Sequence, residues 1–363
     1  MPAPGKLGRQ SRFVVLGAGV SGLSVALALL LRGHAVTLLE RGEAGGESSW
    51  AGGGILSPLL PWHYPEAVNA LALRSMQAYP DWVGQIEARS GKAAEYWRCG
   101  MRIHGGAPEA ALAWCRTHGL TAEDQGERGL LLPEIAQIRN PRLVTAMREA
   151  VLALGGVLQS GCTVLAAHAD DRRIEGVETS LGPFQADHFV LATGAWAGQP
   201  IEGLAPAPNI RPVRGQMLLF RLAAGALDHI LYRDGLYVIP RRDGHVLVGS
   251  TLEDAGFDKS TDAATAGRLQ AEASALLPAL VGMQPIRHWA GLRPGSPDNI
   301  PVIGAHPDFD NVFVNAGHYR YGVTMAPASA ELLVDLIEGR APALDPAPYR
   351  WEAAAARHWK DTP

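Results

Sequence analysis

Two short apolar runs flank a longer apolar stretch near the start of the chain. Phe13 to Leu16 is long enough for a buried parallel strand and too short for a helix, and Ala35 to Leu39 repeats this pattern. The stretch between the two runs predicts a helix. The order of strand, glycine turn, helix and strand therefore indicates a βαβ unit.

Three glycines with the spacing GxGxxG lie in the turn of this unit. Gly17 permits a tight turn, Gly19 lets the backbone approach a pyrophosphate, and Gly22 lets the helix pack closely on the strand. Glu40 follows about twenty residues later, where a carboxylate can accept hydrogen bonds from ribose hydroxyls. Because strand, helix, strand and acid occur in order, we expect a dinucleotide site rather than an accidental glycine-rich turn.

Two further segments carry candidate ligand-binding residues. The loop RGEAGGESSWAGGGILSPLLPW has too much glycine for a regular element, so Ser48, Ser49 and the amides of Gly52 to Gly54 are expected to line a cofactor. The alternative is that these glycines only relieve a crowded turn. A later strand runs into LATGAWAG and brings Thr193, Gly194 and Trp196 to the crevice where open α/β sheets bind ligands.

The rest of the chain alternates between helical and extended patterns. Residues 66 to 90 have apolar positions at helical spacing, and Pro80 is expected to end or kink a helix there. Asn140 is expected to cap a helix that runs to Leu154, with proline in its first turn. Residues 209 to 252 read as successive strands of an antiparallel sheet.

These patterns predict an α/β plus α+β protein of two domains. A second junction of strand, glycine and helix occurs late in the chain, so the cofactor domain is assembled from separated segments. We expect a flexible N-terminus over residues 1–11. A Rossmann-like cofactor-binding domain is expected over residues 12–90, 140–208 and 287–350. An inserted substrate domain with a mostly antiparallel sheet is expected over residues 91–139 and 209–286.

Composition narrows the classes of partner. The 363 residues have a formal net charge of −4 and a pI near 6.3, which argues against nucleic acid. Cys99, Cys115 and Cys162 are widely spaced, so neither a disulfide framework nor a metal site is indicated. The longest apolar stretch, Val25 to Leu31, is too short to span a bilayer. We therefore expect a soluble, cytoplasmic protein.

Several motifs together resemble one family. GAGVSG with Glu40, ESSWAGGGILSP, VRGQ, YVIPR, VGST, WAGLRPGSPD and GHYRYG, in that order, resemble the D-amino-acid oxidase family of flavoproteins, and within it the glycine oxidases associated with thiamin biosynthesis. The resemblance covers about residues 12 to 345. It implies a noncovalently bound FAD and, as is common in the family, a homo-oligomer.

The resemblance also implies where each part of FAD binds. The pyrophosphate is expected beside Val20 and Ser21, the adenosine ribose beside Glu40 and Arg41, and the adenine beside Val164. Along the phosphates and flavin, the resemblance implies Ser48, Ser49, Ala51, Gly53, Gly54 and Ile55. Around the isoalloxazine, at a helix N-terminus, it implies His318, Tyr319, Arg320, Tyr321, Gly322, Val323 and Thr324. Tyr321 stands where glycine oxidases often have asparagine.

Substrate residues implied by the resemblance are Tyr237, Arg293 and Arg320. A guanidinium matches a carboxylate bidentately, which suits an amino-acid substrate, and a tyrosine hydroxyl can donate to the same carboxylate. Arg293 could instead cap a helix or bridge loops, Arg320 could pair with a core carboxylate or with the flavin, and Tyr237 could serve packing alone.

The expected reaction is FAD-dependent oxidation of glycine and related small amines or D-amino acids, with hydride transfer to flavin N5. It would give an imine, then a 2-oxo acid and ammonia, with oxygen reduced to hydrogen peroxide. Three alternatives stay open: a dehydrogenase that passes electrons to a quinone or another carrier, a flavoprotein subunit without this activity, and a tRNA-modifying oxidase, which the acidic balance disfavours.

Overall fold

A computed structural model describes residues 10–105 and 108–359 of the chain. The flexible N-terminus that we expected over residues 1–11 lies mostly outside these residues. Ser11, which is described, is buried, and its amide donates to His34 Nδ1 at 3.3 Å. Within the described residues, no helix combines the length and the apolar character needed to cross a bilayer.

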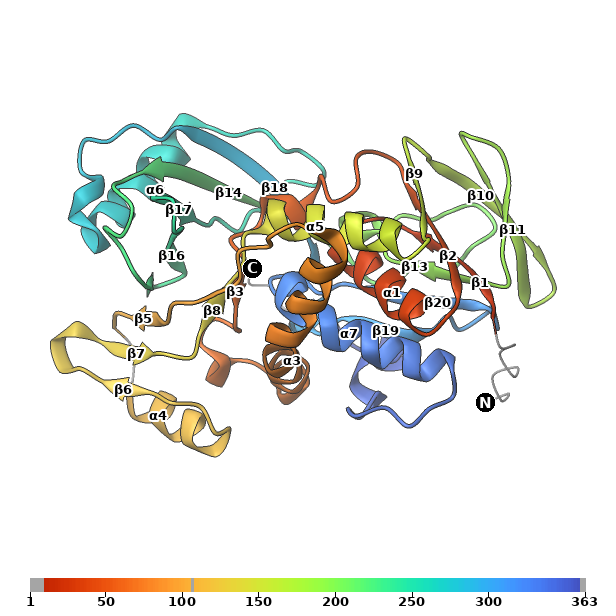
Figure 1. The fold of residues 1–363 in the computed structure, drawn as a ribbon, viewed down its shortest axis with the longest axis horizontal. Helices are drawn as coiled ribbons and strands as arrows, with labels where there is room; N and C mark the ends of the chain where they lie inside the picture. The colour runs from red at the N-terminus through yellow and green to blue at the C-terminus, as the bar shows by residue number, and fades with distance from the viewer. Residues whose placement is uncertain (1–9, 106–107, 360–363) are drawn as a thin grey trace.

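A largely parallel sheet forms the first half of the molecule, on the right in Figure 1. Its strands, in spatial order, are β19 (Val302–Ala305), β20 (Val312–Ala316), β13 (His188–Leu191), β1 (Arg12–Leu16), β2 (Ala35–Glu40) and β9 (Val157–Ser160). Only the β19–β20 pairing is antiparallel. Strands β1 and β2 are joined by α1 (Val20–Leu31), so the predicted βαβ unit is confirmed.

Both faces of this sheet are covered, which explains why its strands are almost wholly apolar. Phe13 and Val15 belong to the core cluster under the helices, whereas Val14 and Leu16 belong to the cluster under the opposite β-layer. The helices are α1, α3 (Glu66–Ser90), α5 (Asn140–Ala153) and α7 (Gly322–Ile337), and the layer consists of β10 (Val164–Asp170), β11 (Arg173–Thr179) and β12 (Phe184–Gln185).

A mostly antiparallel sheet forms the other half of the molecule, on the left in Figure 1. Its strands, in spatial order, are β18 (Arg287–Gly295), β14 (Arg211–Arg221), β17 (His245–Gly249), β16 (Leu236–Pro240), β15 (Ile230–Arg233), β5 (Met101–Ile103), β7 (Leu130–Leu132) and β6 (Glu123–Asp124). Helix α6 (Ala263–Leu276) packs on β14, β16 and β17. The predicted α/β plus α+β fold class is confirmed.

Short elements complete the described chain. They are the strands β3 (Ile55–Leu56), β4 (Trp97–Arg98) and β8 (Ala136–Gln137), the helices α2 (Ser48–Ala51), α4 (Pro108–Thr117) and α8 (Trp351–Ala355), and the 3-10 turns η1 (Pro61–His63), η2 (Gly126–Arg128), η3 (Gly194–Trp196), η4 (Pro278–Leu280), η5 (Pro297–Asn299) and η6 (Ala347–Tyr349). Strand β18 belongs to our expected cofactor segment, yet it pairs along its length with β14 of the other sheet.

The structure contradicts the expectation that Pro80 ends a helix. Helix α3 continues through Pro80 and ends only at Ser90. Pro80 lies on the exposed side of the helix, while Tyr79 and Val83 beside it are buried against the core. Burial on both sides of the proline therefore holds the helix together despite the lost backbone hydrogen bond.

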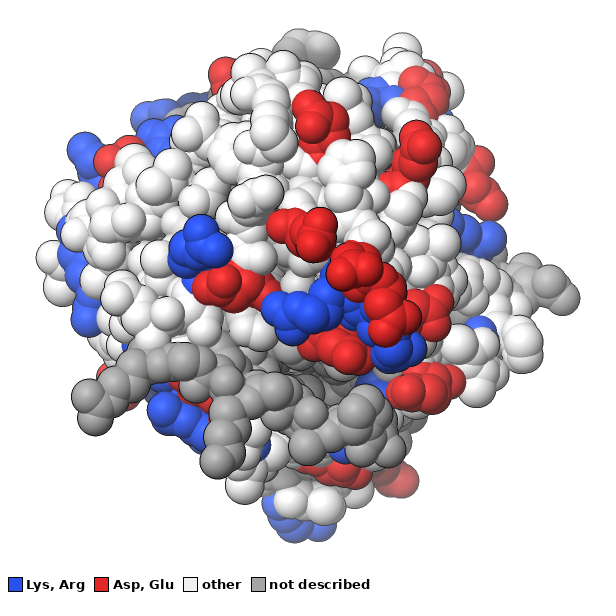
Figure 2. All heavy atoms as spheres, turned by 90° about the vertical axis from the view of Figure 1, so that its right-hand side faces the viewer, with Lys and Arg blue, Asp and Glu red and all other residues white. Residues whose placement is uncertain are grey.

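The surface carries both signs of charge. On the face that Figure 2 shows, acidic and basic side chains lie next to one another rather than in one broad basic area. Exposed ion pairs such as Arg12–Asp187 and Arg172–Asp310 are of this kind. Such pairs contribute little to stability because water screens them.

Candidate active site

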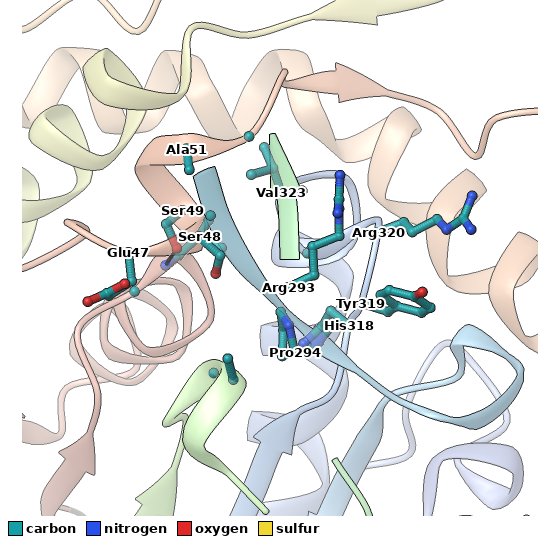
Figure 3. Close-up of a pocket in the computed structure, with 18 of the residues that line it drawn as sticks. Glu47, Ser48, Ser49, Ala51, Arg293, Pro294, His318, Tyr319, Arg320 and Val323 are labelled. Atoms are coloured by element: carbon teal, nitrogen blue, oxygen red, sulfur yellow. Dashed lines mark hydrogen bonds between the residues drawn. The ribbon is translucent and has the colours of Figure 1, made fainter. Parts of the chain in front are cut away.

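A cavity of about 870 Å³ is lined by residues of both sheets and of the loops between them. All the residues that the sequence and the resemblance single out line this cavity except Gly22. Figure 3 shows Glu47, Ser48, Ser49 and Ala51 on one side of the pocket and Arg293, His318, Tyr319 and Arg320 on the other. Segments distant in sequence therefore meet around one space.

The glycine turn between β1 and α1 is packed too tightly for side chains. Gly17 has φ +100, and a Cβ atom there would lie 2.4 Å from the Ala192 carbonyl oxygen. A Cβ at Gly22 would lie 1.9 Å from the Gly17 carbonyl oxygen. Gly22 thus lies behind the cavity and lets α1 begin directly at the turn, as its spacing predicts.

Glu40 holds this turn from the end of β2. One carboxylate oxygen, Oε2, accepts a hydrogen bond from the Ala18 amide at 2.9 Å, and Oε1 accepts one from the Gly42 amide at 2.9 Å. The sequence argument placed Glu40 beside a ribose and missed this backbone role. A carboxylate has about four acceptor positions, so Glu40 can hold the turn and still accept from a ligand hydroxyl.

Arg41 and Trp196 meet at the same end of the cavity. The Arg41 guanidinium carbon lies 3.5 Å from the centre of the Trp196 ring, which is a cation–π contact. Trp196 also stacks with Phe257, with ring centres 5.3 Å apart. Phe257 belongs to the loop between β17 and α6, so this stack joins the two halves of the molecule.

Ser49 is fixed by contacts on two sides. Its hydroxyl accepts from the Val20 amide at 2.8 Å, and its carbonyl accepts from Asn140 Nδ2 at 3.0 Å. Our prediction that Asn140 caps α5 is therefore wrong: the cap position is Arg139, and the Asn140 side chain binds the cofactor-side loop instead. Tertiary contact with Ser49 outweighs the local capping preference.

His318 lies fully buried at the junction that precedes α7. Its Nε2 is 3.0 Å from the Ser329 hydroxyl, which itself donates to the Met325 carbonyl at 2.8 Å, so Nε2 carries the imidazole proton. Its Nδ1 faces the Ser21 hydroxyl at 3.4 Å. Burial lowers the pKa of His318 to about 4, so the ring is neutral near pH 7.

Arg293 is held by three hydrogen bonds, one to strand β14 and two to the residues that follow β17. Nη1 donates to the carbonyls of Arg214 at 3.3 Å and Thr251 at 3.1 Å, and Nη2 donates to the Ser250 hydroxyl at 2.6 Å. A Cβ at Gly215 would lie 2.2 Å from Nη1, so only glycine leaves room for this position. Within the described residues, the Nε–H group and one Nη2–H group of Arg293 have no acceptor. Because Arg293 lines the cavity, these two N–H groups are available to a ligand there.

Arg320 extends into a group of tyrosines. Burial acts to lower the pKa of Arg320, but interactions with the hydroxyls of Tyr64, Tyr321 and Tyr319 outweigh it, and the pKa is raised above its ordinary value. Among the residues that the structure describes, neither Arg320 nor Arg293 forms a salt bridge. The cavity is thus lined by two guanidinium groups that pair with no carboxylate of the described residues.

Tyr237 lies on β16 with its hydroxyl 3.9 Å from the Met217 sulfur, a weak acceptor. Met217, Ser250, Thr251 and Leu59 also line the cavity, and the sequence argument assigned them no role. The motifs VRGQ and VGST adjoin or contain three of them, which was the available signal. Leu59 directly follows the motif ESSWAGGGILSP in the glycine-rich loop, and that position was the available signal for it.

The donors and acceptors around the cavity fit FAD. Two helices, α1 and α7, begin here, and neither N-cap residue, Gly19 or Tyr321, caps its helix with a side chain. The positive end of the helix dipole suits a pyrophosphate at α1 and an electron-rich ring at α7. The cavity also lies within the size range of cofactor sites.

Comparison with known proteins agrees with this fit. The model of the family described as FAD dependent oxidoreductase matches residues 12–336. The chain is 44% identical over 357 residues to the glycine oxidase of Pseudomonas aeruginosa, covering 93% of this chain and 98% of that protein. It is 34% identical over 348 residues to the bifunctional protein ThiO/ThiG of Trichormus variabilis, covering 89% of this chain and 52% of that protein.

A solved structure is similar over nearly the whole chain. The crystal structure of glycine oxidase from Geobacillus kaustophilus aligns with a TM-score of 0.87 at 25% sequence identity, covering 95% of this chain and 99% of that chain. The family model and the first of these relatives each span most of the sequence. The chain therefore belongs to the family of FAD-dependent oxidoreductases and is an enzyme whose cofactor is FAD.

Proposed function

We propose that this enzyme oxidises glycine and related small amines or D-amino acids, such as sarcosine and D-alanine, with oxygen as the electron acceptor. One observation carries the proposal: Arg293 and Arg320 line the cofactor cavity without a carboxylate partner among the described residues. Arg293 and Arg320 are both half-buried, and a partly desolvated cation without a counter-charge is costly, so two of them favour an anionic ligand. The similarity to glycine oxidases supports an amino-acid carboxylate as that ligand.

Arg293 is suited to hold this carboxylate. Its two Nη1 protons and one Nη2 proton are used by protein acceptors, so the guanidinium has a defined orientation. The remaining Nε–H and Nη2–H can form a bidentate pair with a carboxylate. Because the protein orients this arginine before the substrate binds, little side-chain entropy is lost on binding.

Tyr237 and Arg320 complete the proposed substrate site. Among the described residues the Tyr237 hydroxyl has only the Met217 sulfur as acceptor, so it gains a stronger hydrogen bond when a carboxylate oxygen is present. Arg320 adds a second positive charge on the α7 side of the cavity. These contacts hold the carboxylate and leave the amine free to lose its proton.

Bound FAD supplies the acceptor for a hydride from the substrate α-carbon. As the Cα–H bond breaks, the amine loses a proton and a C=N bond forms, and water converts this imine into a 2-oxo acid and ammonia. The two electrons removed from the substrate, together with two protons, reduce one oxygen molecule to hydrogen peroxide. His318 is neutral and bound to Ser329, so we assign it no role as a base and expect the amine to bind unprotonated.

The similarity to ThiO/ThiG supports a place for this oxidation in thiamin biosynthesis. The activity is tested by peroxide release from purified protein saturated with FAD. If glycine, sarcosine, D-alanine and D-proline all fail to give peroxide, the proposed oxidase activity is wrong.

The electron acceptor requires a separate measurement. The flavin is first reduced anaerobically with substrate and is then mixed with oxygen or with a soluble quinone. Fast reoxidation by oxygen supports the oxidase. Reoxidation by quinone alone would identify a dehydrogenase instead.

A further inference from the structure

Tyr321 binds a loop that lies far from it in sequence. Its hydroxyl oxygen accepts a hydrogen bond from the Leu59 amide at 3.0 Å, across 262 positions. Tyr321 is only 2% exposed and immediately precedes α7, which places its ring at the cofactor end of that helix. The Tyr64 ring packs against it edge to face, with ring centres 5.2 Å apart. The tyrosine is thus a rigid part of the wall of the cavity.

The loop that Tyr321 binds has few other means of attachment through its backbone. It runs from Ser57 to Leu60, between β3 and η1, and neither Pro58 within it nor Pro61 directly after it provides an N–H group. Leu60 adopts the left-handed conformation, with φ 56 and ψ 67. A leucine holds that conformation only when its surroundings impose it. The hydrogen bond from the adjacent Leu59 amide is one such constraint.

Leu59 lies at the substrate end of the cavity. It lines the cavity and packs against two core clusters, one containing Tyr321 and the other containing Tyr237. Arg320 interacts with the hydroxyls of Tyr64 and Tyr321, so it lies near the same wall. An apolar side chain in this position occupies space beside the groups that would hold a substrate carboxylate.

We propose that Tyr321 is a positioning residue that fastens the 57–60 loop, and that Leu59 thereby limits the substrate to small side chains. This inference rests on the proposed function, because it concerns the selectivity of the same site. The ring of Tyr321 fills the wall, and its hydroxyl fixes the distance between α7 and the loop. Loss of the hydroxyl alone therefore loosens the wall without emptying it.

Hydrogen exchange of the Leu59 amide tests the attachment without any turnover. In Tyr321→Phe with FAD bound, this amide is expected to exchange about threefold to tenfold faster than in the wild type, because one backbone hydrogen bond is lost. Tyr79→Phe is the matched control, since the buried Tyr79 hydroxyl donates to the Val323 carbonyl of the same helix at 2.7 Å. Equal Leu59 exchange in the wild type and both variants would overturn the inference.

Substrate selectivity tests the consequence. In Tyr321→Phe, the ratio of kcat/KM for D-valine to kcat/KM for glycine is expected to rise about tenfold, and Tyr79→Phe should keep the wild-type ratio. Leu59→Ala removes the wall directly and should raise the ratio even if Tyr321→Phe folds poorly. An unchanged ratio in Leu59→Ala refutes the size limit.

The failure of the proposed function has a different signature. If the wild type oxidises no amino acid at all, the proposed function is wrong and the size limit falls with it. If the wild type oxidises glycine but Tyr321→Phe and Leu59→Ala both keep its ratio of kcat/KM values, only the inference about Tyr321 and Leu59 is wrong.

Discussion

Arg293 donates from Nη2 to the hydroxyl of Ser250 at 2.6 Å, and this bond fixes the orientation of its guanidinium within the cavity. Together with the two carbonyl acceptors of Nη1, it leaves Nε–H and one Nη2–H without an acceptor among the described residues, and these are the groups that we propose bind the substrate carboxylate. The proposed substrate site is therefore organised before an anion binds, and measurable consequences follow from the contacts that organise it.

Replacement of Arg293 should weaken substrate binding far more than cofactor binding. In Arg293→Met, KM for glycine is expected to rise by roughly thirty-fold to several thousand-fold, because a desolvated charge pair loses one partner. Steady-state kinetics with a matching FAD titration measures both effects. Arg287→Met is the control, because Arg287 lies on the same strand but stacks over Trp50 outside the cavity. A KM within threefold of the wild type would remove Arg293 from the substrate site.

Glu40 should determine FAD affinity through the glycine turn. Glu40→Gln leaves one carbonyl oxygen where two carboxylate oxygens hold the Ala18 and Gly42 amides. Loss of a charge-assisted hydrogen bond should raise the FAD dissociation constant by about tenfold to a hundredfold, as measured by flavin fluorescence. Glu43→Gln provides a control in the loop that follows β2, since Glu43 also lines the cavity. Equal FAD affinity of the two variants would contradict the role of Glu40.

Replacement of glycine by alanine should lower the stability at one helix position and raise it at another. Gly22→Ala should lower the free energy of unfolding by about 1–3 kcal/mol or more, because the new methyl group meets the Gly17 carbonyl. Gly84→Ala should raise it by about 0.5–1 kcal/mol, because Gly84 lies inside α3 with open space around it. Urea unfolding at a fixed FAD concentration measures both, and a stable Gly22→Ala would contradict the tight turn.

His318 should make stability depend on pH below neutrality. Its pKa falls from 6.5 to about 4 on folding because burial disfavours the charged ring. Between these values the unfolded chain binds a proton that the folded protein does not, so stability decreases as pH falls from 6.5 toward 4. The shift corresponds to about 3 kcal/mol at most. In urea unfolding across this range, His318→Asn should show a shallower pH slope than the wild type.

The exposed His63 provides the comparison for that measurement. His63→Asn changes the same residue type at the surface, so it should keep the wild-type slope. If His318→Asn and the wild type lose stability in parallel as the pH falls, the buried neutral state of His318 is wrong.

Local signals in the sequence were sufficient for the βαβ unit and for much of the fold class. The glycines at positions 17, 19 and 22 and the apolar runs on either side act over a few residues, so their order alone predicts strand, turn and helix. Where the local signal competed with packing, the prediction failed. Pro80 did not end α3, and Asn140 bound Ser49 rather than capping α5.

The amino-acid sequence by itself determined that this protein has a dinucleotide turn, which residue types are available for a carboxylate, and which family it resembles. Only the tertiary structure decided which of those residues face one cavity and how each is held. The Arg293 guanidinium donates to the carbonyls of Thr251 and Arg214, which lie 42 and 79 positions away in the sequence. The Tyr321 hydroxyl accepts from the amide of Leu59, which lies 262 positions away. In each of these contacts a side chain binds a backbone amide or carbonyl. Every residue has a backbone carbonyl and almost every residue an amide, so the identity of the backbone partner leaves no pattern in the sequence.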